Sequence, residues 1–323
     1  MIIDAHAHLR EGQGEVADFI AAMDEVGIDK ACVSNIVRNA LQNPDEINRF
    51  VFDAVQRYPD RLIGFACLLP QLADSDKLLE RYVRDYGMKG LKLHPPIQDF
   101  SPTDPSIFPV VEKAIELDIP ILFHTGPIFV ERARLRYADP ILIDDLALAF
   151  PEAKIIIGHG DPLGYGPVIA GKHKNVYMDT TIVFARIARF IPGIAEETLE
   201  WMDVGTQSNR PGRAGKDPLA GADKLLFGTD AVQLHTHRFK YGLEPILNMK
   251  IPQEAKAKIL GGNIARLLKL SALANSLGLR GWTDERRATH ERESHEGAPE
   301  GKRPRCRCRY VSRELSLSRG FLA

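Results

Sequence analysis

Histidines and an aspartate stand at the ends of short apolar segments of this 323-residue chain. His6 and His8 end the segment IIDAHAH, His124 ends PILFH, and Asp230 directly follows KLLFGT. Imidazole and carboxylate groups are suitable ligands for Zn²⁺ and similar divalent ions. Side chains two residues apart on a strand share a face, so we expect His6 and His8 to point the same way. This set predicts a metal site assembled from segments that are distant in the sequence.

Three further residues end apolar segments in the same manner. Lys92 and His94 end KGLKLH, again two residues apart, and His159 ends KIIIGH. A single histidine in such a place is more often a hydrogen-bonded core or loop residue than a ligand. The four histidines His6, His8, His124 and His159 together with Asp230 are hard to explain in that way. The set therefore favours one shared functional site.

Eight apolar segments recur along the chain and are separated by helix-like stretches. Their apolar character is continuous rather than alternating, which is typical of strands that are covered on both faces in a parallel sheet. The segments are 2–8, 31–37, 62–68, 89–94, 120–124, 154–159, 176–180 and 224–229.

The stretches between these segments carry apolar residues at helical spacing. Strands that alternate with helices indicate βα units and a parallel sheet. Eight consecutive units favour an α/β fold of the (β/α)₈ TIM-barrel type over an open, doubly wound sheet. We expect helices at 14–27, 44–58, 74–86, 106–117 and 140–150, and two short helices within 252–270.

A barrel of this type would gather the polar residues at one place. The active sites of such barrels lie at the carboxyl ends of the strands, where each of these residues is expected. Closure makes the eighth strand a neighbour of the first, which brings Asp230 beside His6 and His8.

Two connections are longer than the others. Residues 126–139 contain Arg132, whose guanidinium matches carboxylate geometry and is a candidate for binding an acidic substrate. The alternative is a solvated loop face. Residues 203–223 are rich in Gly, Pro and polar residues and are expected to form a loop.

The nearly neutral chain divides into two parts of opposite charge. It contains 42 Lys and Arg against 43 Asp and Glu, a formal net charge of −1. Residues 275–323 hold ten Arg and one Lys against seven acids, a net of +4, which leaves 31 bases and 36 acids, a net of −5, in residues 1–274. We expect one barrel domain at 1–274 and an Arg-rich, disordered C-terminal extension at 275–323.

Composition and hydropathy exclude several classes of protein. No apolar run reaches the roughly 20 residues that cross a bilayer, and the opening MIIDAHAH is unlike a secretory leader. Four cysteines in 323 residues do not make a disulfide framework. The small net charge argues against extensive binding to nucleic acid or membranes. We expect a cytoplasmic protein that acts on a small molecule.

Seven stretches follow one another in a characteristic order. They are IDAHAH at 3–8, GLKLHPPIQDFSP at 90–102, PILFHTG at 120–126, FPEAKIIIGHGD at 150–161, NVYMDTT at 175–181, LLFGTDA at 225–231 and ILGGNIARLL at 259–268. With this ordered set, over about residues 1–271, the chain resembles the amidohydrolase superfamily. The resemblance is greatest to the amidohydrolase-related branch that includes aminocarboxymuconate semialdehyde decarboxylase.

The resemblance implies a role for each matching residue. It makes His6, His8, His124 and Asp230 ligands of a divalent metal ion, with Zn²⁺ expected and Mn²⁺ as the alternative. His159 would be catalytic, either contacting a second metal ion or orienting the attacking water and the substrate. Because a metal lowers the pKa of bound water from 15.7 to about 7, a catalytic Asp230 could take the water proton and pass it to the leaving group. Members of this branch often form homodimers.

Lys92 has two interpretations. In binuclear members of the superfamily a lysine of the fourth strand is carboxylated and bridges two metal ions, and GLKLHP resembles that context. The alternative is an unmodified ammonium that pairs with Asp230 or with a substrate carboxylate. His94 lies two residues further along, so both side chains should face the site if either does, and His94 is a candidate for substrate binding.

Three smaller predictions concern other polar residues. Asp161, close after His159, is a candidate acceptor that would orient that ring. His173 lies in the polar stretch AGKHKN and is expected at the surface. Asn263 is a candidate cap for the second of the two short helices within 252–270.

Three functions remain open at this point. The favoured one is a metal-dependent hydrolase that attacks an amide, ester or lactone of a small, carboxylated substrate. The alternative is a metal-dependent lyase that decarboxylates or hydrates an unsaturated or aromatic acid, because members of the branch do this with the same metal site. A third is a non-enzymatic scaffold with a nucleic-acid-binding tail, against which the seven acids of the tail argue.

Overall fold

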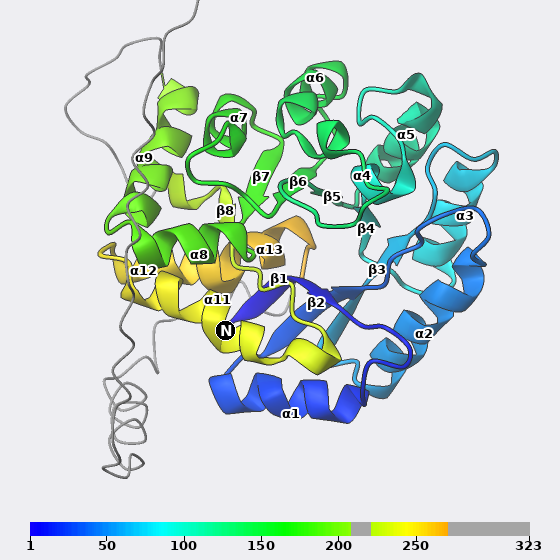
Figure 1. Ribbon diagram of the computed structural model, residues 1–323, viewed down its shortest axis with the longest axis horizontal. Helices are drawn as coiled ribbons and strands as arrows, with labels where there is room; N and C mark the ends of the chain where they lie inside the picture. Colours follow the sequence, from blue (N-terminus) through cyan, green and yellow to red (C-terminus); the bar gives the residue numbers. More distant parts are fainter. Residues whose placement is uncertain (208–220, 271–323) are drawn as a thin grey trace, which may run out of the picture. The chain divides into compact units, whose positions relative to one another are not determined.

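Eight parallel strands alternate with helices in the predicted order (Figure 1). The computed structural model describes residues 1–207 and 221–270, so the predicted extension at 275–323 lies outside the described residues. Every predicted apolar segment contains or overlaps one strand. The strands are β1 (Ile3–His8), β2 (Lys30–Ser34), β3 (Leu62–Cys67), β4 (Gly90–Leu93), β5 (Ile121–His124), β6 (Ile155–Gly158), β7 (Val176–Asp179) and β8 (Leu225–Leu226).

Hydrogen bonds between β1 and the segment that begins at β8 close the sheet into a ring. The backbone N–H of Ala5 donates to the carbonyl of Phe227 at 2.8 Å, and that of His8 donates to Ala231 at 2.8 Å. Asp4 adds a side-chain link, because its carboxylate accepts hydrogen bonds from the backbone N–H and the hydroxyl of Thr229. The predicted (β/α)₈ barrel is confirmed.

Helices surround the barrel and occupy the predicted positions. Each of the first five predicted helices contains an observed one. The α-helices are α1 (Val16–Val26), α2 (Pro44–Arg57), α3 (Ser75–Arg84), α4 (Pro95–Gln98), α5 (Phe108–Glu116), α6 (Ile141–Ala149), α7 (Gly166–Lys172), α8 (Val183–Phe190), α9 (Ile194–Gln207), α11 (His237–Asn248), α12 (Gln253–Ala257) and α13 (Asn263–Leu267). Short 3₁₀ turns form η1 (Pro105–Ile107), η2 (Leu135–Ala138) and η3 (Gln233–His235), and η4 (Lys258–Gly262) is a π-helical turn.

Local sequence explains where the helices begin and end. The side chain of Asn43 accepts a hydrogen bond from the N–H of Asp45 and Pro44 occupies the first turn, which together begin α2. Gly27 ends α1 in the left-handed conformation, with φ of 75°, and its N–H returns to the carbonyl of Asp24.

The segment before β8 departs from the predicted loop at 203–223. Helix α9 continues to Gln207, and the rest of that segment up to 220 lies outside the described residues. Leu199 and Met202 are buried. A Cβ at Gly171 of α7 would lie 2.6 Å from the carbonyl oxygen of Met202, so only glycine permits this close packing of α7 against α9. This packing explains why residues 203–207 continue helix α9, although their polar sequence predicts a loop.

The predicted cap at Asn263 is wrong. Residues 253–267 run through α12, η4 and α13 without a break, so no free helix start exists there. The amide of Asn263 instead donates to the carbonyls of Ala222 and Leu225, at 2.6 and 2.8 Å. Asn263 therefore ties this helical segment to β8.

Apolar side chains fill both sides of the sheet. One cluster packs the strands against the surrounding helices. A second cluster joins residues such as Phe65, Leu122 and Ile156 to Ile264 and Leu267 of α13. Since Leu122 is a register partner of Lys92 and of Ile156, this second cluster lies on the same face of the sheet as Lys92. No helix in 1–207 or 221–270 is long and apolar enough to span a membrane.

Candidate metal centre

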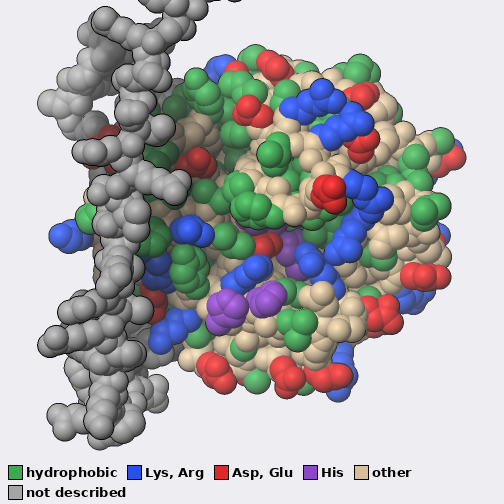
Figure 2. Space-filling model, in the orientation of Figure 1, with side chains coloured by type: hydrophobic (Ala, Val, Ile, Leu, Met, Phe, Trp, Pro, Cys, Tyr) green, Lys and Arg blue, Asp and Glu red, His purple; other side chains and the backbone are tan. Residues whose placement is uncertain are grey.

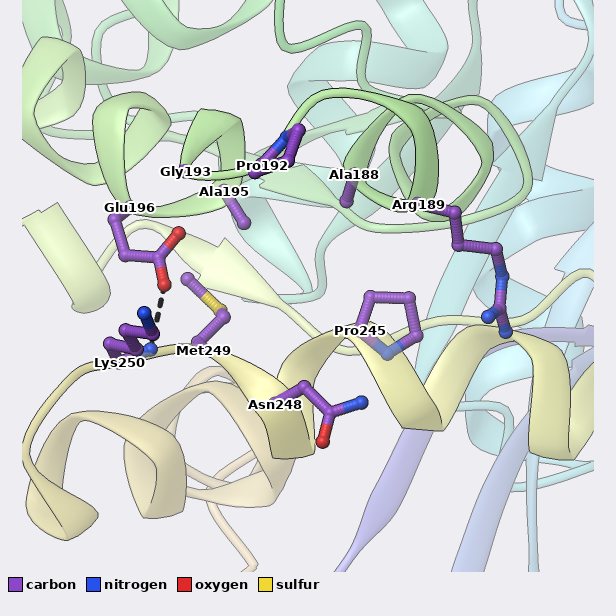
Figure 3. Close-up of a pocket in the computed structure, with 10 residues that line it drawn as sticks. All are labelled: Ala188, Arg189, Pro192, Gly193, Ala195, Glu196, Pro245, Asn248, Met249 and Lys250. Atoms are coloured by element: carbon purple, nitrogen blue, oxygen red, sulfur yellow. Dashed lines mark hydrogen bonds between the residues drawn. The ribbon is translucent and has the colours of Figure 1, made fainter.

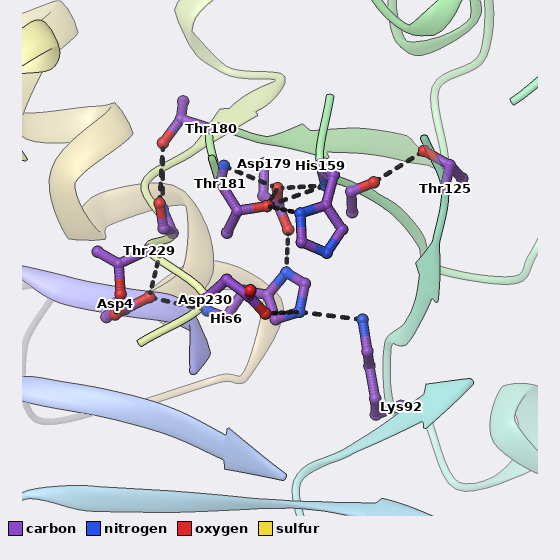
Figure 4. A network of polar contacts seen from close by, with 12 residues as sticks. Asp4, His6, Lys92, Thr125, His159, Asp179, Thr180, Thr181, Thr229 and Asp230 are labelled. Carbon is purple, nitrogen blue, oxygen red and sulfur yellow. Dashed lines mark hydrogen bonds and ion pairs between the residues drawn. The ribbon is translucent and has the colours of Figure 1, made fainter. Parts of the chain in front are cut away.

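The segment-ending polar residues lie at the carboxyl ends of the strands. Figure 4 shows four of them, His6, Lys92, His159 and Asp230, close together. The whole set comes from β1, β4, β5 and the residues just after β4, β6 and β8. Six of the side chains are buried, and the side chain of Asp230 is 16% exposed. The six are His6, His8, Lys92, His94, His124 and His159.

A bulge in β1 places its two histidines. Asp4 pairs with Ala31 of β2 and Ala7 pairs with Val33, so two residues of β1 stand opposite one residue of β2. Such bulges re-aim side chains next to active sites. His8 follows His6 by two residues after the shift, and the two rings lie edge to face with centroids 5.2 Å apart.

His6 is oriented by the carboxylate of Asp179, which lies 173 residues further along the chain. Its Nδ1 lies 2.7 Å from Oδ2 of Asp179, at the end of β7. An ionised carboxylate only accepts hydrogen bonds, so Nδ1 carries the proton and Nε2 carries the lone pair. This Nε2 lies 3.0 Å from Nζ of Lys92 and 3.8 Å from Oδ1 of Asp230. The lone pair of His6 therefore faces the centre.

The hydrogen bonds of Thr181 fix the tautomer of His159 in a similar way. The hydroxyl of Thr181 donates its only proton to Asp179 at 2.7 Å, so it can only accept from Nδ1 of His159 at 3.1 Å. The Nε2 atom of His159 therefore carries a lone pair. The ring lies with its centroid 5.0 Å from that of His6 and 4.4 Å from that of His124.

Asp230 contributes a negative charge to the centre. Its Oδ1 lies 3.1 Å from Nε2 of His8, and its Oδ2 accepts a hydrogen bond from Nη1 of Arg238 at 2.8 Å. Burial by itself raises the pKa of Asp230, but the hydrogen bond with His8 and the neighbouring histidines outweigh it and hold that pKa well below its usual range. Asp230 is therefore an anion at neutral pH.

His159 and Asp230 share an uncommon backbone conformation. Their φ angles are 60° and 55°, in the left-handed region that non-glycine residues rarely adopt. Hydrogen bonds hold both: the N–H of His159 donates to Asp179 at 2.8 Å and that of Asp230 donates to the carbonyl of His6 at 2.7 Å. Strain of this kind, maintained by the surroundings, is common at functional sites.

His94 and His124 form a buried stack. Their ring centroids lie 3.7 Å apart with an interplanar angle of 14°. Nδ1 of His94 and Nε2 of His124 are buried without a hydrogen-bond partner in the described part of the chain. Buried polar atoms normally have partners, so these two nitrogens are available to a ligand.

Burial keeps the imidazoles neutral. It lowers the pKa of His6, His8 and His159 to about 4, and it holds that of His94 and His124 well below the usual range. Neutral imidazole is the form that binds metal ions. Burial also lowers the pKa of Lys92, to about 8.

A comparison with protein families identifies the barrel. The amidohydrolase family model matches residues 3–270. The chain belongs to the amidohydrolase family. It is a metal-dependent enzyme of the amidohydrolase superfamily, as the ordered motifs predict.

One curated relative matches part of this amidohydrolase. It is the 2-keto-4-carboxy-3-hexenedioate hydratase of Sphingobium sp. strain NBRC 103272 / SYK-6, which is 28% identical over 139 residues. The match covers 35% of this chain and 39% of the relative, so the chain aligns with about two fifths of the length of that enzyme.

Solved structures share the fold of this amidohydrolase over nearly their full length. A dihydroxybenzoic acid decarboxylase from Polaromonas sp. JS666, with bound manganese and the inhibitor 2-nitroresorcinol, has a TM-score of 0.60 and 19% identity, covering 83% of this chain and 97% of that one. The 4-oxalomesaconate hydratase from Rhodopseudomonas palustris has a TM-score of 0.58 and 20% identity, covering 85% and 98%. At these identities the likeness concerns the fold alone.

The donor set of this amidohydrolase fits a divalent ion. His6, His159 and Asp230 each offer a ligand atom, and these atoms lie within 4.8 Å of one another. The lone pairs of two neutral imidazoles converge there with an anionic carboxylate, an arrangement that a cation stabilises. The predicted ligand set includes His8 and His124, whereas the structure brings His159 into the tightest group. Which of these residues bind the ion stays a prediction.

Lys92 contacts a different partner from the predicted ones. Its Nζ is hydrogen-bonded to Nε2 of His6 rather than to Asp230. That same lone pair would bind the metal ion, so metal binding requires Lys92 to give up this contact or to be chemically altered. The carboxylation of Lys92 stays a prediction.

Some sequence predictions around the centre are wrong. Asp161 does not orient His159: its Oδ1 accepts the N–H of Leu163 at 2.9 Å. His173 is not a surface residue, because it is 9% exposed and its Nε2 lies 2.6 Å from Oδ1 of Asp144. Arg132 is exposed in the connection after β5, and its role in substrate binding stays a prediction.

Four residues at the centre were not assigned roles from the sequence. Asp179 and Thr181 lie in the motif NVYMDTT, at and just after the end of β7, and the position of this acid at a strand end could have identified it. Arg10 follows His8 by two residues, and Arg238 follows Asp230 by eight. Neither spacing was used to predict a role from the sequence. Their contacts depend on tertiary structure.

A cavity lies away from the histidines (Figure 3). It has a volume of about 480 Å³ and lies between α8, α9 and α11. Glu196 and Lys250 lie on one side, where the carboxylate of Glu196 accepts the N–H of Lys250 at 2.6 Å. The cavity contains none of the sequence-predicted site residues. The histidine cluster is therefore the candidate functional site.

Proposed function

We propose that this amidohydrolase-family enzyme is a lyase that decarboxylates or hydrates a small unsaturated or aromatic carboxylic acid. The observation that carries the proposal is the metal-ligand cluster beside Arg238 and Arg10, since such a centre suits an anionic substrate. The relatives named above are a decarboxylase and two hydratases, which supports this function over the hydrolysis that the sequence favours.

A divalent ion would be held by His6, His8, His124 and Asp230, with His159 as a further ligand. Zn²⁺ and Mn²⁺ both suit imidazole and carboxylate ligands, and the Polaromonas structure contains manganese. When bound, the ion would polarise an oxygen atom of the substrate or of water.

The protein's own groups divide the remaining tasks. Asp230 is ionised and held by Arg238, so it is the group that accepts a proton and returns it. His159 presents a neutral Nε2, which can accept a hydrogen bond from water or from a substrate hydroxyl. Lys92 is the cation that can pair with a substrate carboxylate once its contact with His6 is released.

An activity screen tests the proposal. The full chain, loaded separately with Zn²⁺ and Mn²⁺, is incubated with hydroxybenzoates, with unsaturated keto acids, and with lactones, amides and esters. We expect metal-dependent release of carbon dioxide, or loss of the conjugated double bond as water adds, and both should stop when a chelator is added. Turnover confined to lactones, amides or esters would show that the enzyme is a hydrolase.

The variants Asp230→Asn and Asp161→Asn provide a matched pair for the same screen. Asp230→Asn removes the proton acceptor and should abolish turnover. Asp161→Asn changes a carboxylate that accepts the N–H of Leu163 within its own loop, and this variant should turn over at the wild-type rate.

A further inference from the structure

His124 differs from the other predicted ligand histidines in how its ring is held. A histidine that binds a metal ion normally has its second ring nitrogen hydrogen-bonded to the protein, which fixes the orientation of the ring. The partners of Nδ1 are Asp179 for His6, the carbonyl of Ser34 for His8 and Thr181 for His159. His124 has no such partner in residues 1–207 or 221–270, and its Nε2 is buried without a hydrogen bond.

In place of a hydrogen bond, His124 has a stacked neighbour. The rings of His94 and His124 are nearly parallel, with centroids 3.7 Å apart and an interplanar angle of 14°. The side-chain torsion that turns a histidine ring has broad energy minima. A ring without a hydrogen bond therefore stays in place only if its neighbours restrict its rotation. A parallel ring at this distance does so, because turning His124 would drive its edge into His94.

The ring of His94 is carried by a backbone that is itself fixed. The backbone N–H of His94 donates to Oε1 of Gln98 at 2.7 Å. The amide of Gln98 in turn donates to the carbonyls of Val37 and Leu68, at 2.7 and 2.8 Å. Since these residues follow β4, β2 and β3, the hydrogen bonds of Gln98 join the ends of three neighbouring strands. His94 therefore has a fixed position from which its ring can restrict that of His124.

His94 contacts the cluster through the face of its ring. Its Nδ1 is buried without a partner, and no side chain in 1–207 or 221–270 is hydrogen-bonded to the ring. His94 and His124 are 3% and 6% exposed, so the two rings pack against each other away from bulk water.

We propose that His94 is a positioning residue, which orients the predicted metal ligand His124 by ring stacking. His94 then acts through His124 and need not touch the ion. This inference rests on the proposed function in one respect, the assignment of His124 as a ligand. It applies equally to a lyase and to a hydrolase, because both would use the ion.

Two substitutions separate the ring of His94 from its nitrogen atoms. His94→Phe keeps a flat ring without nitrogen, and His94→Asn keeps a polar group without a ring. Each full-length variant is loaded with Co²⁺, whose visible absorption depends on the number and geometry of its ligands, and competition with a chelator measures the affinity. His94→Phe should keep the wild-type affinity and spectrum. His94→Asn should bind about three- to tenfold more weakly, as the loss of one ring stack allows, and its spectrum should change.

A double variant tests whether His94 acts through His124. His124→Ala should weaken Co²⁺ binding more than His94→Asn does, because it removes a ligand. His94→Asn/His124→Ala should bind no more weakly than His124→Ala alone, since no ring is left to orient. A merely structural role of His94 would add its full loss in the double variant, and that result would overturn the proposal.

Histidine side chains also lie at the surface, as Figure 2 shows for one face of the molecule. His235 is exposed, and the centroid of its ring lies 5.8 Å from that of His237. His235→Ala is therefore the control and should bind Co²⁺ as the wild-type protein does.

The remaining outcomes separate the role of His94 from the ligand assignment. Wild-type affinity and spectrum in His94→Asn would overturn the positioning role. Weak binding by a folded His94→Phe would also overturn it, because a nitrogen atom of His94 would then be required. Wild-type affinity in His124→Ala would overturn the ligand assignment, and the inference with it. If His124→Ala binds weakly while His94→Asn binds normally, only the role of His94 fails.

Discussion

Asp179 controls which atoms of two histidines face the centre. One carboxylate receives Nδ1–H of His6, the backbone N–H of His159 and the hydroxyl of Thr181. Burial by itself raises the pKa of Asp179, but His6 outweighs it and lowers that pKa to about 2. The ionised carboxylate accepts all three hydrogen bonds and so leaves the lone pairs of both rings directed at the candidate metal site.

Asp179→Asn should weaken metal binding. An amide has only one acceptor oxygen and cannot receive hydrogen bonds at both positions, so His6 loses the partner that fixes its tautomer. Loss of such a supporting partner typically costs about 10- to 100-fold in metal affinity. Competition with a chelator, followed by metal analysis of the protein, measures the change.

Two further variants set the upper and lower limits expected for metal affinity. Asp161→Asn changes a carboxylate that does not support the histidines and should bind metal as the wild-type protein does. The double variant His6→Ala/His8→Ala should retain almost no metal. Wild-type affinity in Asp179→Asn would contradict the role given to this carboxylate, and stoichiometric metal in the double variant would contradict the predicted ligands.

Single side chains join the elements that surround the centre. Asn263 links the helical segment 253–267 to β8, the shortest strand, by donating to two buried carbonyls. Asp144 of α6 pairs with Lys172 and His173 at the end of α7. Both contacts connect elements far apart in the sequence.

Asn263→Ala should destabilise the barrel by about 2–4 kcal/mol, because two carbonyls lose their partners and buried unsatisfied groups are costly. The midpoint of urea unfolding measures the loss. Asn248→Ala is the control: Asn248 is exposed at the end of α11, and its replacement should change stability by less than about 0.5 kcal/mol. Equal midpoints for the two variants would contradict the role of Asn263.

Asp144 should make stability depend on pH in the acid range. Burial by itself raises the pKa of Asp144, but Lys172 and His173 lower it below the ordinary 3.8. A carboxylate with a lowered folded-state pKa contributes stability above its unfolded pKa and loses it as pH falls through the folded value. At pH 7 the Asp144→Asn variant should therefore be less stable than the wild-type protein. The difference should be only about 1 kcal/mol, because the ion pair is partly exposed. It should shrink as the pH falls below 3.8, the ordinary pKa of this group.

Urea unfolding of both proteins between neutral and acid pH measures this difference. Asp145→Asn serves as the control, because Asp145 is the exposed neighbour of Asp144 on α6. It should match the wild-type protein at every pH. A difference between Asp144→Asn and the wild-type protein that stays constant down to the lowest pH would contradict the assignment.

Strands and helices were predictable where the local sequence pattern alone decides them. The apolar segments predict all eight strands, and the first predicted helix, at 14–27, ends at Gly27 as the structure shows. The continuation of α9 to Gln207 was not predictable, because it depends on close packing against Gly171 of α7. Asn263 was assigned to the wrong partner for a similar reason, since its acceptors lie about 40 residues earlier.

The whole molecule combines an acidic barrel with a basic C-terminal segment. The family match ends at residue 270, and all residues assigned to the centre precede it. The net charge of −5 over residues 1–274 makes the positively charged groups near Asp230 a local feature rather than a general one.

A chain shortened to residues 1–274 should keep the function of the full protein. It should bind the same amount of metal, melt at the same temperature and turn over the same substrates, because the described centre and its supporting contacts lie within 1–270. Metal analysis, thermal unfolding and the activity screen measure these properties. Loss of metal or activity would show that residues 275–323 contribute to the centre or to its folding.

The sequence by itself determined the order of the elements and the end of the barrel that carries the chemistry. Both follow from local pattern: apolar segments separated by helices predict the barrel, and polar residues at segment ends predict the site. Only the tertiary structure decided which atoms face the candidate metal site and how the charged groups beside it are paired. His6 and Asp179 lie 173 residues apart, so their contact and the tautomer it selects exist only once the barrel closes. The guanidinium of Arg10, whose Nε is buried without a hydrogen bond to residues 1–207 or 221–270, likewise depends on neighbours that no sequence spacing reveals.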